Sequence, residues 1–468
     1  MIMSFKSSTA IAALLAVAGL GLAAMPAAAA DLGGDCCADL EERIAELEAT
    51  TVRKGNRKVK LEVSGHVNQA LIVWDDGVEQ NAGFYTNDNS RTRFRFKGSA
   101  KVTEDVKAGF LLEIGVRSAN SKRFTQDDPV ALDESGLDVR HSAWYLESKS
   151  YGTVWLGTTG PAAESITEIN LAQTKDVAKF SDIEDTALGL NIRFLNGNIG
   201  VRDNGGTAEA VSYRRLIDHS GDQPGESERG PIVKYVTPEF QGFTATTAWG
   251  GDDYWDVGVN YKGEFSGFKL AAGIAYGEET SADGDAGIID SCLTDDGLDA
   301  GLGSDAKCRQ VGGSMSVMHE PSGIYVNFAA GWREDELIDK PGLFTATGVG
   351  ADPESTFWAL EGGIEQKFFP IGKTTLFGQY YDFEGGSNDN RRLSFTGNTA
   401  DQERIANTEV QMYGGGVVQG IDAAAMSLYA YYRHYEFGVS LIEGDGTPVA
   451  NPGIEDVDVF VAGGIIKF

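Results

Sequence analysis

From Val59 onward apolar and polar residues alternate along the chain, and this period of two predicts β-strands. The first stretch has an apolar face of Leu61, Val63, Val67, Leu71 and Val73 and a polar face of Glu62, Ser64, His66 and Asn68. The segments 255–262 and 324–333 repeat the alternation. Because a two-sheet sandwich and a closed barrel both produce this pattern, it predicts an all-β protein without deciding between the two.

The links between the candidate strands fall into two classes of length. Short links lie at 103–105, 149–151, 238–242, 263–267, 321–323 and 370–372. They alternate with long polar segments near 75–89, 120–137, 158–187, 278–310, 334–354, 385–406 and 438–456. Short turns at one end and long loops at the other are typical of bacterial outer-membrane barrels. We therefore expect a transmembrane antiparallel β-barrel.

The number of strands follows from the same pattern. Up to eighteen segments qualify as strands, and the pair near 188–196 and 209–217 is the weakest. Without that pair sixteen strands remain, and we favour sixteen over eighteen. Both numbers are even, which makes the first and last strands antiparallel neighbours.

The chain ends inside the last predicted strand, at Phe468. Phe460, Ala462, Ile466 and Phe468 fall on one face of that strand. An open apolar edge promotes aggregation, and barrel closure removes such edges. The terminal strand resembles the C-terminal assembly signal of outer-membrane barrels, and we expect Phe468 to belong to that signal.

The N-terminal region predicts export. Residues 1–30 resemble a secretory signal, because Lys6 is the only charge, 9–25 is almost wholly apolar and small residues precede Asp31. An uncleaved anchor helix is the alternative, and the small-residue exit favours cleavage. Residues 31–58 are expected to form a short periplasmic helix, at 35–54, followed by a basic linker. The barrel domain is then 59–468.

Composition and cysteine use narrow the possible partners. The formal net charge of −30 excludes a nucleic-acid partner, because phosphate binding needs clustered Lys and Arg.

Cys292 and Cys308 lie in one polar segment and can form a disulfide in an exported protein. Cys36 and Cys37 can pair with each other, pair between chains or stay reduced. The Cys and His spacings match no zinc site, so we expect neither a metal nor another cofactor.

Two parts of the chain resemble a known family. The segment Tyr235–Phe243 is similar to a hairpin motif of general porins, and Asp35–Thr50, with Arg53–Asn56 and Val63–Gly65, closely resembles porins of alphaproteobacteria. The resemblance implies a homotrimer of barrels in the outer membrane of a Gram-negative bacterium, in contact with lipid and lipopolysaccharide. It also implies a water-filled pore in each barrel, narrowed by the third long loop.

The strongest local signal is the segment Arg91–Lys97. On a strand, its four cations project to one side and its two phenylalanines to the other; the cations are Arg91, Arg93, Arg95 and Lys97. An Arg or Lys facing lipid at the bilayer midplane costs about 2–4 kcal/mol, so we expect the four to line a water-filled lumen. Arg117 on the next strand would extend this basic wall, and Glu113 in the same register would partly neutralise it.

The opposing charge is expected in the long segment after Gly157. The resemblance implies that this loop folds inward and that its acids face the basic wall across a constriction. The acids expected there are Glu164, Glu168, Asp182 and Glu184. The alternative is that the acidic loop is simply solvated.

Together these features predict a passive diffusion channel for small hydrophilic solutes and ions, with charged rings that bias which ions pass. We expect no enzymatic activity, because the five histidines are scattered and match no nucleophile or metal motif. The alternative function is a structural or adhesive barrel tethered through helix 35–54. An energy-coupled receptor would need a plug domain larger than the segment that precedes the barrel.

Overall fold

The computed structural model divides the chain into two units, Met1–Arg57 and Lys58–Phe468. The residues that it describes are 58–130, 136–204, 206–217, 223–251, 253–280, 288–289, 307–336, 352–386, 392–443 and 446–468. The predicted signal, helix 35–54 and the linker up to Arg57 lie outside these residues, so the domain boundaries stay predictions. Among the described residues, no helix is long and apolar enough to cross a membrane.

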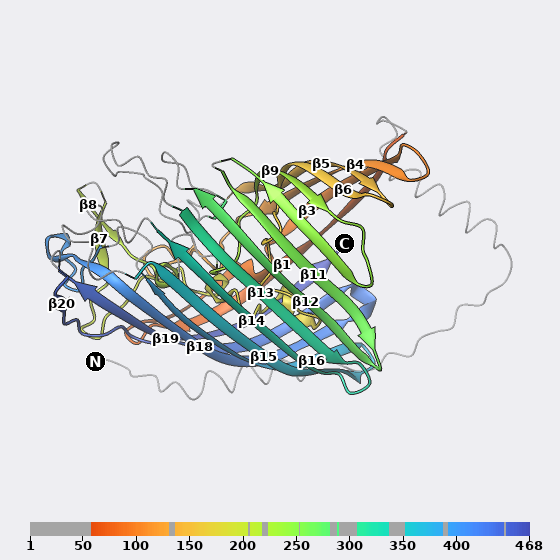
Figure 1. Ribbon diagram of the computed structural model, residues 1–468. Coiled ribbons are helices and arrows are strands. Elements are labelled where there is room, and N and C mark those ends of the chain that lie inside the picture. The colour runs from red at the N-terminus through yellow and green to blue at the C-terminus, as the bar shows by residue number, and fades with distance from the viewer. Residues whose placement is uncertain are drawn as a thin grey trace. The chain divides into compact units, whose positions relative to one another are not determined.

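The unit Lys58–Phe468 forms a closed antiparallel barrel of sixteen strands (Figure 1). In chain order they are β1 (Lys60–Asp75), β3 (Arg93–Lys101), β4 (Val106–Val116), β5 (Leu137–Ser148), β6 (Gly152–Thr159), β9 (Gly230–Val236), β10 (Phe243–Trp249), β11 (Trp255–Phe265), β12 (Phe268–Thr280), β13 (Lys307–His319), β14 (Ile324–Asp335), β15 (Glu354–Phe369), β16 (Gly372–Gly386), β18 (Glu403–Ile421), β19 (Met426–Ile442) and β21 (Val457–Lys467). The prediction of sixteen strands is confirmed.

Shorter elements lie beside the ring and in the loops. Three short strands pair with ring strands: β2 (Gln80–Thr86) with β1, β17 (Arg392–Leu393) with β18, and β20 (Pro448–Val449) with β19. β7 (Val201–Asn204) and β8 (Thr207–Ala210) form a separate two-stranded sheet. The 3-10 helices are η1 (Asp88–Ser90), η2 (Gln173–Asp176), η3 (Ile183–Asp185), η4 (Tyr213–Leu216), η5 (Thr399–Asp401) and η6 (Asp422–Ala424).

Closure occurs between the first and last strands. β1 and β21 pair from His66 opposite Lys467 to Asp75 opposite Asp458. Beyond this ladder the Phe468 amide donates to the Gly65 carbonyl at 3.0 Å, and the Gly65 amide donates back at 2.9 Å. A Cβ at Gly65 would lie 2.7 Å from the Phe468 ring, so the glycine makes room for the terminal aromatic residue. The edge of the last strand is therefore paired, as expected; the assembly role of Phe468 stays a prediction.

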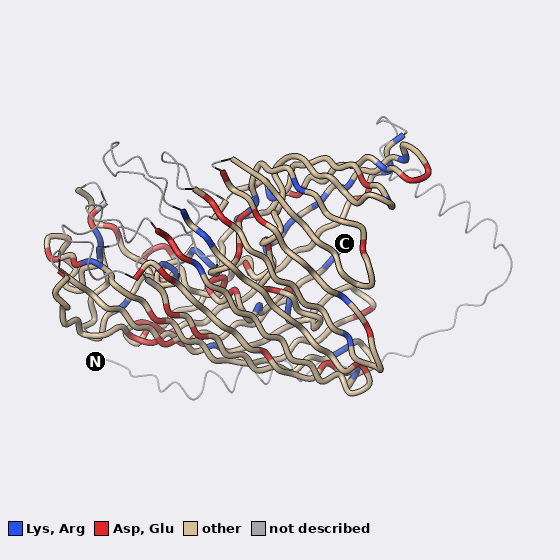
Figure 2. The backbone as a smooth tube through the Cα atoms, in the orientation of Figure 1, with Lys and Arg blue, Asp and Glu red and all other residues tan. Residues whose placement is uncertain are grey.

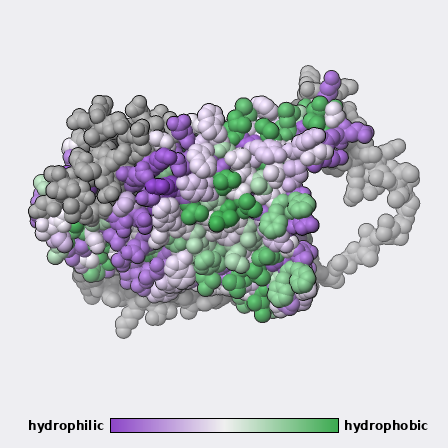
Figure 3. Space-filling view, viewed as in Figure 1, coloured by the Kyte–Doolittle hydropathy of each residue, from purple (hydrophilic) through white to green (hydrophobic). Residues whose placement is uncertain are grey.

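The barrel is apolar on its outer face. Along β14, Ile324, Val326 and Phe328 are exposed, and the residues between them are buried toward the interior. Figure 3 shows hydrophobic residues gathered over the strands and hydrophilic residues toward the end that carries β7, β8 and β20. In Figure 2 the strands facing the viewer are mostly tan over their central parts. An apolar outer band with charge inside and at the ends is what a lipid-spanning barrel requires.

The chain between β6 and β9 folds into the barrel. The amides of Ile169 and Leu171 each donate to a serine hydroxyl of β13 at 3.0 Å. The Gln173 amide donates to the Glu365 carboxylate of β15 at 2.9 Å, and the Val177 carbonyl accepts from Asn87 at 2.9 Å. This segment therefore crosses the interior, and the expectation of an inward-folded loop is confirmed.

The segments 188–196 and 209–217, the weakest strand candidates, are not barrel strands. Leu190, Ile192 and Phe194 are fully buried, as is Tyr213 of η4. They pack in one apolar cluster with interior residues of β1, β18, β19 and β21. The alternating apolar residues of these segments therefore pack against the inside of the barrel and do not contact lipid.

Candidate functional site

Three arginines of the barrel wall share one carboxylate. Glu113 of β4 is fully buried; its Oε1 lies 2.9 Å from Nε of Arg140 and 3.3 Å from Nη1 of Arg93. Its Oε2 accepts a 2.6 Å hydrogen bond from Nε of Arg95. Three guanidinium groups beside one carboxylate leave a local excess of positive charge. The expected partial neutralisation by Glu113 is present, and it comes from the wall itself.

Arg140 reaches this cluster through a β-bulge. Glu113 pairs with His141 whereas Ile114 pairs with Val139, so Arg140 is the extra residue of β5. A bulge breaks the strict alternation of faces and re-aims side chains. The sequence analysis missed Arg140 for this reason, because its position depends on a register shift that a period-two pattern does not contain.

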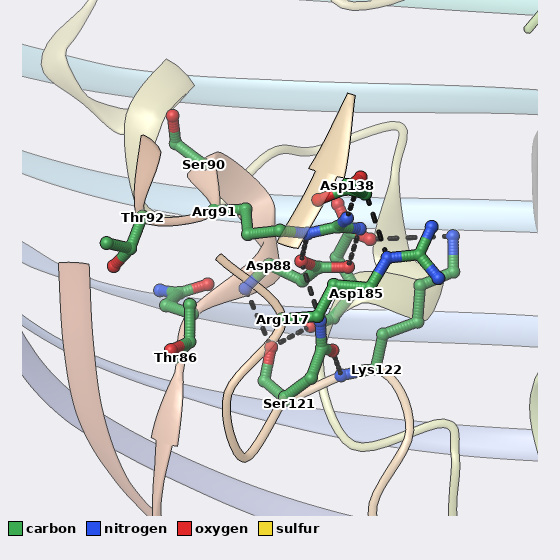
Figure 4. Close-up of polar contacts among 12 residues, drawn as sticks. Thr86, Asp88, Ser90, Arg91, Thr92, Arg117, Ser121, Lys122, Asp138 and Asp185 are labelled. Atoms are coloured by element: carbon green, nitrogen blue, oxygen red, sulfur yellow. Dashed lines mark hydrogen bonds and ion pairs between the residues drawn. The ribbon is translucent and has the colours of Figure 1, made fainter. Parts of the chain in front are cut away.

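Arg91 lies outside the strand on which it was predicted. β3 begins at Arg93, and Arg91 follows η1 in a break between β2 and β3. Its guanidinium binds Asp88 and lies 2.9 Å from Asp138 Oδ2, which Arg117 also approaches at 3.5 Å (Figure 4). Burial alone would raise the pKa of Asp88, but Arg91 holds it well below its usual range. Arg91 and Arg117 thus form ion pairs with local acids.

The acids of the inward-folded loop surround two lysines. Lys179 Nζ lies 2.9 Å from Glu168 and 3.7 Å from Asp185, and it also contacts Asp182. Lys122, from the loop after β4, lies 3.4 Å from Glu184 and 3.6 Å from Asp185.

Three of these acids could hold a metal by distance alone. The carboxylates of Asp182, Glu184 and Asp185 come within 4.8 Å of one another. Because Lys122 and Lys179 already form ion pairs with them, the arrangement is an ion-pair network, and we assign no metal to it.

Crowding shifts the protonation of this acidic cluster, which comprises Glu168, Asp182, Glu184, Asp185 and Glu226. Burial, opposed by Lys179 and aided by Asp182, raises the pKa of Glu168 to about 7. Burial and Asp182 likewise raise the pKa of Asp185 to about 6. Burial also tends to raise the pKa of Asp182, but Lys179 lowers it below its usual range. The negative charge of the cluster therefore varies across the neutral pH range.

A cavity of about 410 Å³ separates the basic wall from these acids. Of the predicted residues, Arg91, Arg93, Glu164, Glu168 and Asp182 line it. Four predicted residues do not line the cavity: Arg95, Lys97, Arg117 and Glu184. Lys97 is exposed further along β3, and Glu184 is buried and accepts a hydrogen bond from Gln223. The charged lining residues not predicted from the sequence are Asp88, Lys122, Arg140, Lys175, Asp176, Lys179, Asp185, Glu226, Glu228 and Arg229.

The loop is held in place by buried polar groups of the wall. Gln379 of β16 donates to Glu361 of β15 and, at 2.7 Å, to the Ala178 carbonyl. Arg433 of β19 donates to Gln379 at 3.0 Å, to Thr186 at 3.1 Å and to the Lys179 carbonyl. Arg433 and Glu361 are fully buried. These contacts fix the cavity wall that carries the acids.

One of the two cysteines of the predicted disulfide is described. Cys308 of β13 is buried and disulfide-bonded. Cys292 lies outside the described residues, so the pairing of Cys292 with Cys308 stays a prediction.

The chain matches a family model described as Gram-negative porin over residues 10–447. It belongs to the Gram-negative porin family. Membership of this family, together with the closed barrel and its charged interior, makes the protein an outer-membrane porin whose strands cross the membrane repeatedly and whose lumen is a diffusion channel.

Solved structures with a similar barrel have low sequence identity to this porin. An anion-selective porin from Comamonas acidovorans is 14% identical, with a TM-score of 0.49 over 88% of this chain and 100% of that chain. OmpT of Vibrio cholerae is 11% identical, with a TM-score of 0.48 over 89% and 99%. OmpF of Salmonella typhi, in complex with daunomycin, is 14% identical, with a TM-score of 0.45 over 88% and 98%. A comparison with curated proteins gives no match.

Proposed function

We propose that this porin conducts small hydrophilic solutes and ions passively, and that the cavity between the arginine wall and the acidic loop selects among them. The observation that carries this proposal is the unequal pairing on the wall, where Arg93, Arg95 and Arg140 share one acidic partner, Glu113, among the residues that the structure describes. Charges that line a narrow aqueous passage bias which ions pass.

Whether the channel prefers anions or cations depends on whether the arginines of the wall or the acids of the inward-folded loop stay charged. The raised pKa values of Glu168 and Asp185 leave the acidic cluster partly protonated near neutral pH, whereas the guanidinium groups stay charged. We therefore propose an anion preference at pH 6 that declines as the pH rises. We assign no catalytic role to the protein.

The test is single-channel recording of the purified protein in a planar bilayer with a salt gradient. Stepwise openings with a reversal potential of the sign for anions would support both parts of the proposal. A conducting but cation-selective channel would overturn the selectivity. A folded barrel that stays silent would overturn the channel function and favour the structural or adhesive barrel tethered through helix 35–54.

A homotrimer is the proposed assembly, in line with the resemblance to alphaproteobacterial porins. β9 and β10 have 7 residues each, and β6 has 8. At about 3.3 Å per residue and a tilt of about 45°, seven residues cover roughly 16 Å, less than the apolar band of about 25 Å. β18 and β19, with 19 and 17 residues, exceed that band. The short side of the wall therefore fits against another copy better than against lipid.

Cross-linking tests this assembly. Val233 of β9 and Val326 of β14 are both exposed on the outer face. With a short bis-maleimide, Val233→Cys should give covalent dimers in native membranes, because each single thiol reacts with one end of one linker, and Val326→Cys should stay monomeric. Equal cross-linking at both positions, or none at Val233, would contradict the placement of the interface. Contact with lipid and lipopolysaccharide is proposed for the long-strand side.

A further inference from the structure

A second segment inside the barrel, Gln223–Arg229, lies directly on the wall. Gly225 has a φ of +94°, and a Cβ there would lie 2.4 Å from the Cα of Gly312 on β13. A Cβ at Gly331 on β14 would lie 1.8 Å from the Pro224 carbonyl oxygen. The segment and the two strands approach backbone to backbone, which glycine alone permits.

Polar contacts fix the orientation of this segment. Gln310 of β13, fully buried, accepts from the Gly225 amide at 3.0 Å and donates to the Ser227 hydroxyl at 2.9 Å and to the Glu226 carbonyl. Gln223, also fully buried, accepts a hydrogen bond from Tyr381 of β16. The segment is therefore anchored to β13 and β16 and is not a loose loop tip.

The segment is also bonded to the inward-folded loop. Gln223 donates to Glu184 at 2.6 Å, and the Thr167 amide donates to Glu226 at 3.0 Å. Arg229 forms an ion pair with Glu164. The side chains of Glu226, Glu228 and Arg229 line the same cavity as Arg93 and Arg140.

We propose that Gln223–Arg229 is a second constriction element and that Arg229 determines the ion selectivity of the channel. Arg229 neutralises Glu164, the loop acid that would otherwise lie free in a cavity lined by Arg93 and Arg140. The excess positive charge around Glu113 is therefore left to act on passing ions. This inference rests on the proposed function and adds a residue to it.

A double-mutant cycle tests the role of Arg229. Arg229→Gln leaves Glu164 unpaired and should raise the cation-to-anion permeability ratio roughly two- to fivefold, the size expected for one charge beside the ion path. Glu164→Gln leaves Arg229 unpaired and should lower the ratio by a similar factor. The double variant should return close to wild type, because it removes one charge of each sign. Non-cancelling shifts, or no shift in either single variant, would overturn the proposal.

Two further variants separate charge from structure. Arg229→Cys, treated with a cationic or an anionic thiol reagent, should move the permeability ratio back toward wild type or further away, respectively. Arg309→Gln, at an outward-facing position of β13, is the matched control and should leave the ratio unchanged. A conducting wild type with an unresponsive position 229 would refute this inference alone. A silent wild type would refute the proposed function.

The position of the whole segment can be tested separately. Gly312→Val should displace Gln223–Arg229 from the wall and change single-channel conductance. Gly362→Ala is the control, because its added Cβ would meet nothing closer than a backbone oxygen at 4.0 Å. If both variants conduct like wild type, Gln223–Arg229 is not a constriction element.

Discussion

Nε of Arg140 lies 2.9 Å from Oε1 of Glu113, the oxygen that Nη1 of Arg93 approaches at 3.3 Å. The single buried carboxylate of Glu113 thus contacts three arginines of the basic wall, and its one negative charge is smaller than their three positive charges. The selectivity of the pore should respond more to this carboxylate than to the many acids on the exposed loops, because exposed charges are screened within about 10 Å.

Glu113→Gln should make the channel more anion-selective and the barrel less stable. The substitution leaves three guanidinium groups without their carboxylate, at a cost of about 1–3 kcal/mol in the free energy of unfolding. Reversal potentials and thermal unfolding in detergent would measure the two effects. Glu147→Gln, which breaks an exposed pair with Lys107, is the control. Equal effects at both positions would contradict the central role of Glu113.

Arg140→Gln should shift selectivity toward cations by roughly two- to fivefold, the effect of one charge beside the path. Lys97→Gln should change it less, because Lys97 lies outside the cavity lining and Arg140 lines it. The measurement is the reversal potential of each variant in the same salt gradient. A larger effect at Lys97 would contradict this prediction and would favour the basic wall as the alternation of residues predicted it, with Lys97 beside the ion path.

Selectivity should depend on pH between about 5 and 8. The pKa of Glu168 is raised to about 7 and that of Asp185 to about 6, so both acids are neutral below these values and negative above them. The cation-to-anion permeability ratio should therefore rise as the pH increases through this window. Glu168→Gln should flatten the upper part of the curve. An unchanged curve in this variant would show that another group titrates.

Arg433→Gln should loosen the inward-folded loop without preventing barrel formation. It removes charged hydrogen bonds to the Lys179 carbonyl and Thr186, each worth about 1.5–3 kcal/mol. We expect larger and noisier single-channel conductance and faster proteolysis of the loop. Lys367→Gln, an exposed residue paired with Asp422, is the control. Wild-type conductance in Arg433→Gln would mean that the remaining anchors suffice.

The alternation of residues, the sorting of link lengths and the terminal strand predicted the barrel, its sixteen strands and its closure. These features are local: a lipid-facing strand must carry apolar residues at every second position, whatever its neighbours are. For the same reason the cations of Arg91–Lys97 could be assigned to the interior. The face of each side chain follows from the environment of a single strand, and the strand number follows from the order of short and long links along the chain.

The pairing of charges was decided by the tertiary structure. Arg140 enters the site through a register shift, Arg91 through a break before β3, and Arg229 through a segment that folds back onto β13. Which acid meets which cation depends on contacts between residues far apart in the chain, and the energy of a charge depends on its burial. The alternation of a strand fixes the face of a side chain, and only the folded barrel fixes its partner.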